Sequence, residues 1–137
     1  MKLTEKQYET LVKMIYLGNW VIEESNDDPN SDYQALEQYI LSQAKEYGFD
    51  KNVIFDEESK LHYLSEEYEE ASELFDLIDE YENELVNNTL AAHFGEKETD
   101  EKFPSLEGEA FDEKADELSE KYYDKFSKEG LEPLKLK

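Results

Sequence analysis

Acidic side chains at helical spacing are the residues of this sequence whose pattern could do chemistry. Ten of the 19 residues from Glu66 to Glu84 are acidic, and no lysine or arginine occurs between Lys60 and Lys97. On a helix that rises about 1.5 Å per residue, this is roughly one negative charge per 2.8 Å of axis, and one DNA strand carries one per about 3.4 Å. The spacing predicts an anionic face for a basic protein partner, with six candidate contacts: Glu66, Glu69, Glu70, Glu73, Asp76 and Glu80.

The same row of acids lowers the stability of the helix that carries it. Carboxylates three or four residues apart, such as Glu66 and Glu70, repel each other by a few tenths of a kcal/mol per pair. Because no lysine offsets this repulsion, we interpret the row as a docking surface. Its concrete form would be a DNA or RNA mimic that occupies the basic groove of a nucleic-acid-binding enzyme and inhibits it. An uncharacterised adaptor with a solubilising acidic coat explains the same charges, and that alternative stays open.

A second pattern places two carboxylates three residues apart on each of two expected helices. Glu70 and Glu73 form one pair, Glu113 and Asp116 the other, and oxygen ligands at this spacing can hold Mg²⁺. The arrangement is similar to that of all-α nucleotide pyrophosphohydrolases, which makes an Mg²⁺-dependent hydrolase the alternative function. However, 37 of the 137 residues are acidic, so such spacings arise by chance, and no basic cluster could receive a triphosphate. The leading interpretation has no catalytic residue and no metal or other cofactor.

Other candidate sites fail on spacing. Residues 28–32 begin like a calcium loop, but Tyr33 stands where the loop needs glycine and Tyr39 where it needs a bidentate glutamate. His62 and His93 have no glutamate three residues before them, so the Glu-x-x-His pair of di-iron bundles is absent. The chain has no cysteine, which removes thiolate catalysis and thiolate metal sites.

The overall charge restricts the partners. All 14 basic residues are lysine and the formal net charge is -23. Without arginine the chain lacks the planar fork that binds phosphate and guanine, and its charge repels nucleic acids and anionic membranes. The most apolar stretch, Met14 to Ile22, is far shorter than the ~20 residues that span a bilayer, and no apolar signal core precedes it. We therefore expect a cytoplasmic protein that binds neither nucleic acid nor membrane directly.

Apolar periodicity predicts five helices that would position these acids. The first begins at a Thr4–Gln7 capping box and is expected to be buried on most sides, with Gly18 marking the close approach of another element. The others are expected from Ser31 to Gly48, from Ser65 to a break near Glu82-Asn83, from there to Gly95, and from Phe111 to Gly130.

Two short β-prone runs interrupt the helices. Val53–Phe55 and Leu61–Leu64 flank a polar turn and predict a hairpin, which a tail containing Leu134 and Leu136 could extend as a third strand. Glu96–Glu109 is polar, contains proline and glycine, and is expected to be a mobile loop. With 13% aromatic residues the chain is typical of a folded protein rather than a disordered acidic one. We predict one mainly α domain over residues 1–137, a helical bundle with a small hairpin.

The segment Tyr8-x-x-Leu11-x-x-x-Ile15-Tyr16-Leu17-Gly18-Asn19-Trp20 resembles the opening of a family of small acidic bacterial proteins. Members of that family also share an Asp-rich turn, a Phe/Tyr-Asp hairpin and a Gly-Leu/Ile-Glu tail near the C-terminus. The resemblance implies a bacterial protein with this helical fold. It implies no activity and no site residue.

Overall fold

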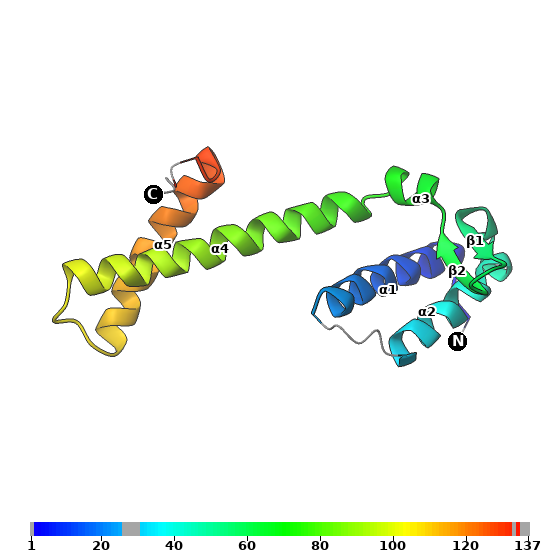
Figure 1. Ribbon diagram of the computed structural model, residues 1–137, viewed down its shortest axis with the longest axis horizontal. Coiled ribbons are helices and arrows are strands. Elements are labelled where there is room, and N and C mark those ends of the chain that lie inside the picture. The colour runs from blue at the N-terminus through cyan, green and yellow to red at the C-terminus, as the bar shows by residue number, and fades with distance from the viewer. Residues whose placement is uncertain (1, 26–30, 133, 135–137) are drawn as a thin grey trace. The chain divides into compact units, whose positions relative to one another are not determined.

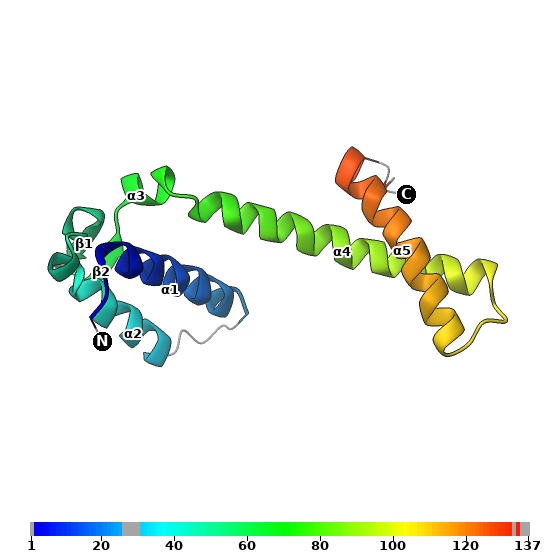
Figure 2. The ribbon, with the colours of Figure 1, turned by 180° about the vertical axis from the view of Figure 1, so that it is seen from behind.

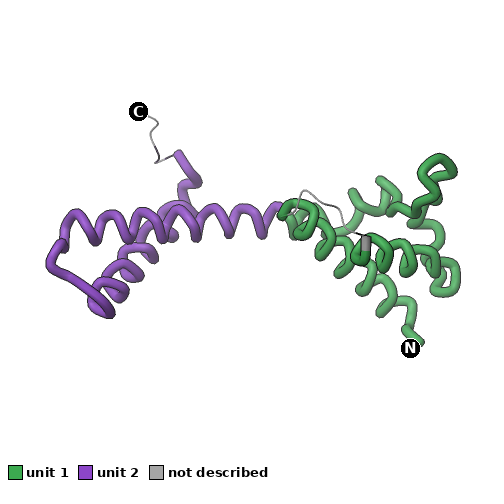
Figure 3. Tube along the Cα trace, turned by 60° about the horizontal axis from the view of Figure 1, so that its bottom comes forward, with its two compact units in different colours: residues 1–78 green, residues 79–137 purple. Residues whose placement is uncertain are grey.

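The computed structural model describes residues 2–25, 31–132 and 134 (Figure 1). These contain five α-helices, two short 3-10 helices and one two-stranded antiparallel hairpin, which confirms the predicted mainly α fold with a small hairpin. The chain divides into two compact units, residues 1–78 and 79–137 (Figure 3). The single domain over residues 1–137 stays a prediction. Within the described residues, no helix combines the length and apolar character needed to cross a membrane.

Helix α1 (Glu5–Ser25) begins at the predicted capping box. The Thr4 backbone N–H donates to Gln7 Oε1 at 2.9 Å, and the Gln7 N–H donates to Thr4 Oγ1 at 3.2 Å. The expectation that this helix is buried on most sides is wrong, because only Tyr8 and Val12 are buried. The expected close approach at Gly18 is also wrong, since a Cβ there would meet nothing within 4 Å.

The expected second helix is composed of two pieces. Helix α2 (Ser31–Ser42) is followed by the 3-10 helix η1 (Ala44–Tyr47). Gly48 ends η1 at the predicted position with a φ of 66°, a left-handed conformation that glycine adopts without a Cβ penalty. A second 3-10 helix, η2 (Asp50–Asn52), leads into the hairpin.

The hairpin pairs β1 (Val53–Asp56) with β2 (Leu61–Leu64) in antiparallel register, with Phe55 opposite His62. The side chain of Gln38 on α2 binds the outer edge of β2. Its Nε2 donates to the His62 carbonyl at 2.9 Å and its Oε1 accepts from the His62 N–H at 2.6 Å. In the described part of the chain the sheet has two strands, and Leu134 is not one of their residues. Leu136, the other residue of the proposed third strand, lies outside that part.

The core of residues 1–78 combines aromatic rings with buried aliphatic side chains, among them Val12 and Leu74. Tyr8 stacks on Tyr47 at 4.4 Å between ring centroids, and its hydroxyl donates to the Ile40 carbonyl at 2.5 Å. Phe49 meets Tyr8 edge-on at 5.7 Å and Tyr68 at 5.0 Å. This arrangement buries large apolar area in a unit that has few long helices to pack.

The expected third helix ends about ten residues early. Helix α3 (Glu66–Ala71) begins at the predicted cap, where the Ser65 hydroxyl accepts from the Tyr68 N–H at 3.2 Å. Ser72 is extended and its hydroxyl lies 3.5 Å from the Leu74 N–H, at the start of α4 (Leu74–Lys102). Leu74 is fully buried in the core, so the chain turns there to place it.

Helix α4 is continuous where the sequence predicted a break and a loop (Figure 2). It runs through Glu82-Asn83 and Gly95, so the predicted mobile loop Glu96–Glu109 is helical as far as Lys102. Only residues 103–108 connect it to α5 (Glu109–Glu129), which ends at Gly130 as predicted. Gly95 lies inside the helix because α5 crosses there.

The α4–α5 crossing is close. A Cβ on Gly95 would lie 2.7 Å from the Ala115 carbonyl oxygen, and closer still to Ser119 Oγ. Thr99 is completely buried beside this crossing, and its hydroxyl donates to the Gly95 carbonyl at 2.8 Å. Phe94 packs against Phe126, with 6.0 Å between ring centroids. Residues 79–137 therefore form a helical hairpin centred on a glycine contact.

Candidate functional site

The predicted acidic row does not lie on one helix. α3 is six residues long, and the chain is non-helical at Ser72 and Glu73 before α4 begins. The charge density expected for an uninterrupted helix therefore does not apply across this link. The six candidate contacts divide into three on α3, one in the link and two on α4: Glu66, Glu69 and Glu70; Glu73; and Asp76 and Glu80.

Glu73 is paired with a lysine from α1. Lys13 Nζ lies 3.0 Å from both carboxylate oxygens of Glu73 and 3.3 Å from Oε1 of Glu9. Hydrogen bonding to its own backbone N–H, together with the Lys13 ammonium, lowers the pKa of the Glu73 carboxyl. The sequence pattern missed this partner because it lies 60 residues away in the chain.

Glu69 is half-buried and is held against Tyr16. Burial raises the pKa of the Tyr16 hydroxyl to about 12, with the Glu69 charge and hydrogen bond adding to the effect. Glu69 is thus oriented toward α1 rather than presented freely.

The remaining four candidates are exposed and form no ion pair within the described residues. Glu66 and Glu70 lie on α3, and Asp76 and Glu80 follow each other by four residues on α4. The ion pairs found in the described chain use other carboxylates. A partner could contact these four acids of the predicted set without breaking an existing ion pair.

The residues of the magnesium alternative are placed differently from the prediction. Glu70 and Glu73 no longer share a helix, because α3 ends at Ala71, whereas Glu113 and Asp116 both lie on α5. Glu70 and Glu73 belong to residues 1–78 and the other two to residues 79–137. In the part of the chain that is described, no group of three or more acidic or histidine side chains could hold a metal ion.

The histidines and the calcium-like turn give no further site. His62 packs against Phe55 at 4.9 Å and His93 against Phe94 at 5.6 Å between ring centroids. Residues 28–30 of the calcium-like turn lie outside the described residues.

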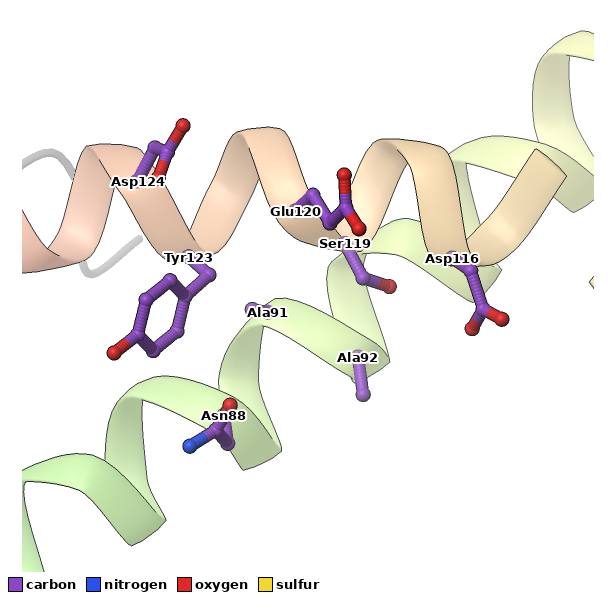
Figure 4. A pocket seen from close by; sticks show the side chains of 8 residues that line it. All are labelled: Asn88, Ala91, Ala92, Asp116, Ser119, Glu120, Tyr123 and Asp124. Atoms are coloured by element: carbon purple, nitrogen blue, oxygen red, sulfur yellow. The ribbon is translucent and has the colours of Figure 1, made fainter. Parts of the chain in front are cut away.

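A hollow that the sequence analysis missed lies between α4 and α5 (Figure 4). Its volume is about 480 Å³, and we call it the α4–α5 groove. Three of its acids recur at four-residue intervals along α5, a signal that the sequence contains but that does not show which side faces α4. The lining residues are Asn88, Ala91, Ala92, Asp116, Ser119, Glu120, Tyr123 and Asp124.

Comparisons of the chain with protein-family models, with curated proteins and with solved structures gave no match. The resemblance to a family of small acidic bacterial proteins therefore stays a prediction.

Proposed function

We propose that this chain is a non-enzymatic, cytoplasmic binding protein that engages a positively charged protein surface through α3 and the first turns of α4. The observation that carries the proposal is the exposure of Glu66, Glu70, Asp76 and Glu80 without any ion pair in the described residues. No lysine occurs on α3 or on α4 before Lys97 that could neutralise them. Repulsion between these carboxylates lowers the stability of the isolated protein, and a cationic partner that covers them would offset this repulsion.

The mechanism is electrostatic steering followed by docking of carboxylates where a nucleic acid would place phosphates. Attraction between opposite charges speeds association, and salt screens it over about 8 Å at physiological ionic strength. In its concrete form the protein is a DNA or RNA mimic that occupies the basic groove of a nucleic-acid-binding or defence enzyme. Affinity should then fall steeply as salt rises.

The test compares charge reversal inside and outside the proposed surface. The immobilised chain is exposed to cell lysate at low salt, and retained proteins are eluted by a salt gradient or by competing DNA and identified by mass spectrometry. We expect nucleic-acid-binding proteins on the wild type and none on the Glu66→Lys, Glu70→Lys, Asp76→Lys variant.

The matched control reverses three exposed acids elsewhere in the same unit: Glu46→Lys, Asp50→Lys, Glu58→Lys. It changes the net charge equally and should retain the same proteins. Circular dichroism must show unchanged helicity for both variants. Equal retention by the wild type and the first variant, or retention that DNA does not displace, would overturn the proposal.

A further inference from the structure

We propose that the α4–α5 groove binds a basic amphipathic helix of a partner protein, which packs beside α4 and α5 as a third helix. The site uses none of the acids assigned to the proposed function, so the two proposals can fail separately. Three observations carry it: the unpaired acids of the rim, the segregation of lysines on α5, and the small, partly apolar floor.

The rim of the groove is anionic on its α5 side. Asp116, Glu120 and Asp124 are exposed and follow one another by one helical turn, or about 6 Å of axis. None of them joins an ion pair in the described part of the chain. In Figure 4 Asp116 lies at one end of the groove, and Glu120 and Asp124 line the outer side of α5. A helix with lysine or arginine at every turn would match this spacing.

The lysines of α5 lie on its other flank. At about 100° per residue, Lys114, Lys121 and Lys125 are directed away from the groove side of the helix. There Lys114 and Lys121 bind Glu117 at 2.8 and 3.0 Å, and hydrogen bonds from both lysines lower the pKa of that carboxyl. The two flanks of one helix thus differ: one carries lysines, two of which bind Glu117, and the other carries acids without an ion pair in the described chain.

The floor admits another helix. Ala91, Ala92 and Ser119 are small, and small side chains allow helix axes to approach within about 8–10 Å. Seven residues before Ala92, on the same face of α4, Leu85 is 52% exposed and would be covered by the apolar face of the incoming helix.

A second copy of this chain does not fit the charge of the groove as well as a basic helix does. Each copy carries a net charge of -23, so two copies repel at long range. The lysine flank of α5 is itself divided by Glu117, which would face the acids of the rim. The occupant is therefore assigned to a cationic partner.

The test measures binding of a fluorescein-labelled helical peptide of lysine and leucine at amphipathic spacing, about 18 residues or five turns long. The full-length chain is titrated and anisotropy is followed. The groove variant is Asp116→Asn, Glu120→Gln, Asp124→Asn; a second variant, Ala92→Phe, fills the floor from an exposed position. The control, Glu46→Gln, Asp50→Asn, Glu58→Gln, removes the same charge from exposed acids that belong to neither proposed surface.

We expect the groove variant and Ala92→Phe each to weaken binding by about tenfold, or ~1.4 kcal/mol, and the control to leave it nearly unchanged. A scrambled peptide of the same composition should bind at least about tenfold more weakly. Equal losses in the groove variant and the control would show that total charge is sensed and would overturn the inference. Loss in the control alone would also overturn it. No effect of Ala92→Phe, no peptide binding, or a dimer in sedimentation that the groove variant abolishes would also overturn it.

Discussion

Residues 1–78 bury a cluster of aromatic rings, whereas residues 79–137 pack two helices across a glycine. In the first unit Tyr8 lies between Tyr47 and Phe49, and the elements around it are short. In the second unit Gly95 lets the backbone of α5 approach, and the rings of Phe94, Tyr122 and Phe126 meet beside the crossing at 5.5 to 6.1 Å between centroids. Both units therefore depend on the volume of aromatic side chains, and the second also depends on the absence of a side chain at Gly95.

The comparison extends to the acids. In residues 1–78 the candidate acid Glu73 is bound by Lys13 across helices. In residues 79–137 tyrosine hydroxyls bind the acids that link α4 to α5: Tyr122 donates to Glu98 at 2.6 Å and Tyr123 to Glu84 at 2.7 Å. Tyr68 of the first unit likewise donates to Glu9 at 2.9 Å, and Lys102 also binds Glu98 at 2.6 Å, so both units hold carboxylates with lysine and tyrosine.

The largest effect should come from removing ring volume in the first unit. Tyr8 is 1% exposed, so Tyr8→Ala should lower the free energy of unfolding by about 3–5 kcal/mol, measured by urea titration with circular dichroism. Met14→Ala on the same helix is the control, because Met14 is 66% exposed and should change stability by less than about 0.5 kcal/mol. If both variants lost a similar free energy of unfolding, the conclusion that α1 is buried along only one face would be wrong.

Adding volume to the second unit should have the next largest effect. Gly95→Ala places a Cβ against Ser119 and the Ala115 carbonyl, and overpacking costs about 1–3 kcal/mol, more than the ~1 kcal/mol that alanine gains in a helix. Gly18→Ala meets nothing within 4 Å, so the same substitution should stabilise by up to ~1 kcal/mol. Thermal unfolding of the pair should give shifts of opposite sign; two upward shifts would contradict the close crossing.

High pH should destabilise the first unit through its tyrosines. Burial raises the pKa of Tyr8 from 10.0 to about 12, with Tyr47 adding to it, and that of Tyr16 also to about 12. Because these folded-state pKa values exceed the unfolded ones, the stabilisation is complete below pH 10 and is lost as pH rises toward 12. As pH rises through this window, the urea midpoint should fall while the phenolate absorbance rises. A Tyr8→Phe, Tyr16→Phe variant should show a weaker pH dependence; an unchanged one would contradict the assignment.

The smallest expected effect concerns the ion pair of Glu73. Lys13→Gln should raise the Glu73 pKa toward its ordinary value, since the ammonium no longer favours the carboxylate. The stability that this ion pair supplies is present above the pKa of Glu73 in the unfolded chain. It is lost as pH falls through the pKa of Glu73 in the folded protein. NMR titration of the Glu73 carboxyl carbon measures the shift, with Lys51→Gln as the control. The same Glu73 pKa in both variants would show that Lys13 does not bind Glu73 in solution.

Elements that depend on local hydrogen bonds could be predicted from the sequence. The Thr4–Gln7 box, the Ser65 cap, Gly48 and the hairpin all depend on partners within a few residues. The break before Leu74 could not be predicted, because it follows from that residue's place in the core.

Glycines show why local signals mislead. Gly18 suggested a close contact and has none, whereas Gly95 suggested a helix end and is the contact. The sequence around each glycine does not distinguish a close contact from a helix end, because the atoms that approach Gly95 belong to α5. The site follows the same rule: the acids are visible in the sequence, but the pairing of Glu73 with Lys13 and the side of α5 that lines the groove depend on tertiary packing.

The amide of Gln38 has a consequence for how the hairpin can associate. A glutamine side chain carries the same donor and acceptor as a peptide group, and here both are used at His62 on the outer edge of β2. A stack of strands grows only if each unit offers two unpaired edges. With one edge occupied from within the chain, this hairpin could accept at most one further strand. It therefore cannot serve as the repeating unit of a longer sheet while α2 stays folded.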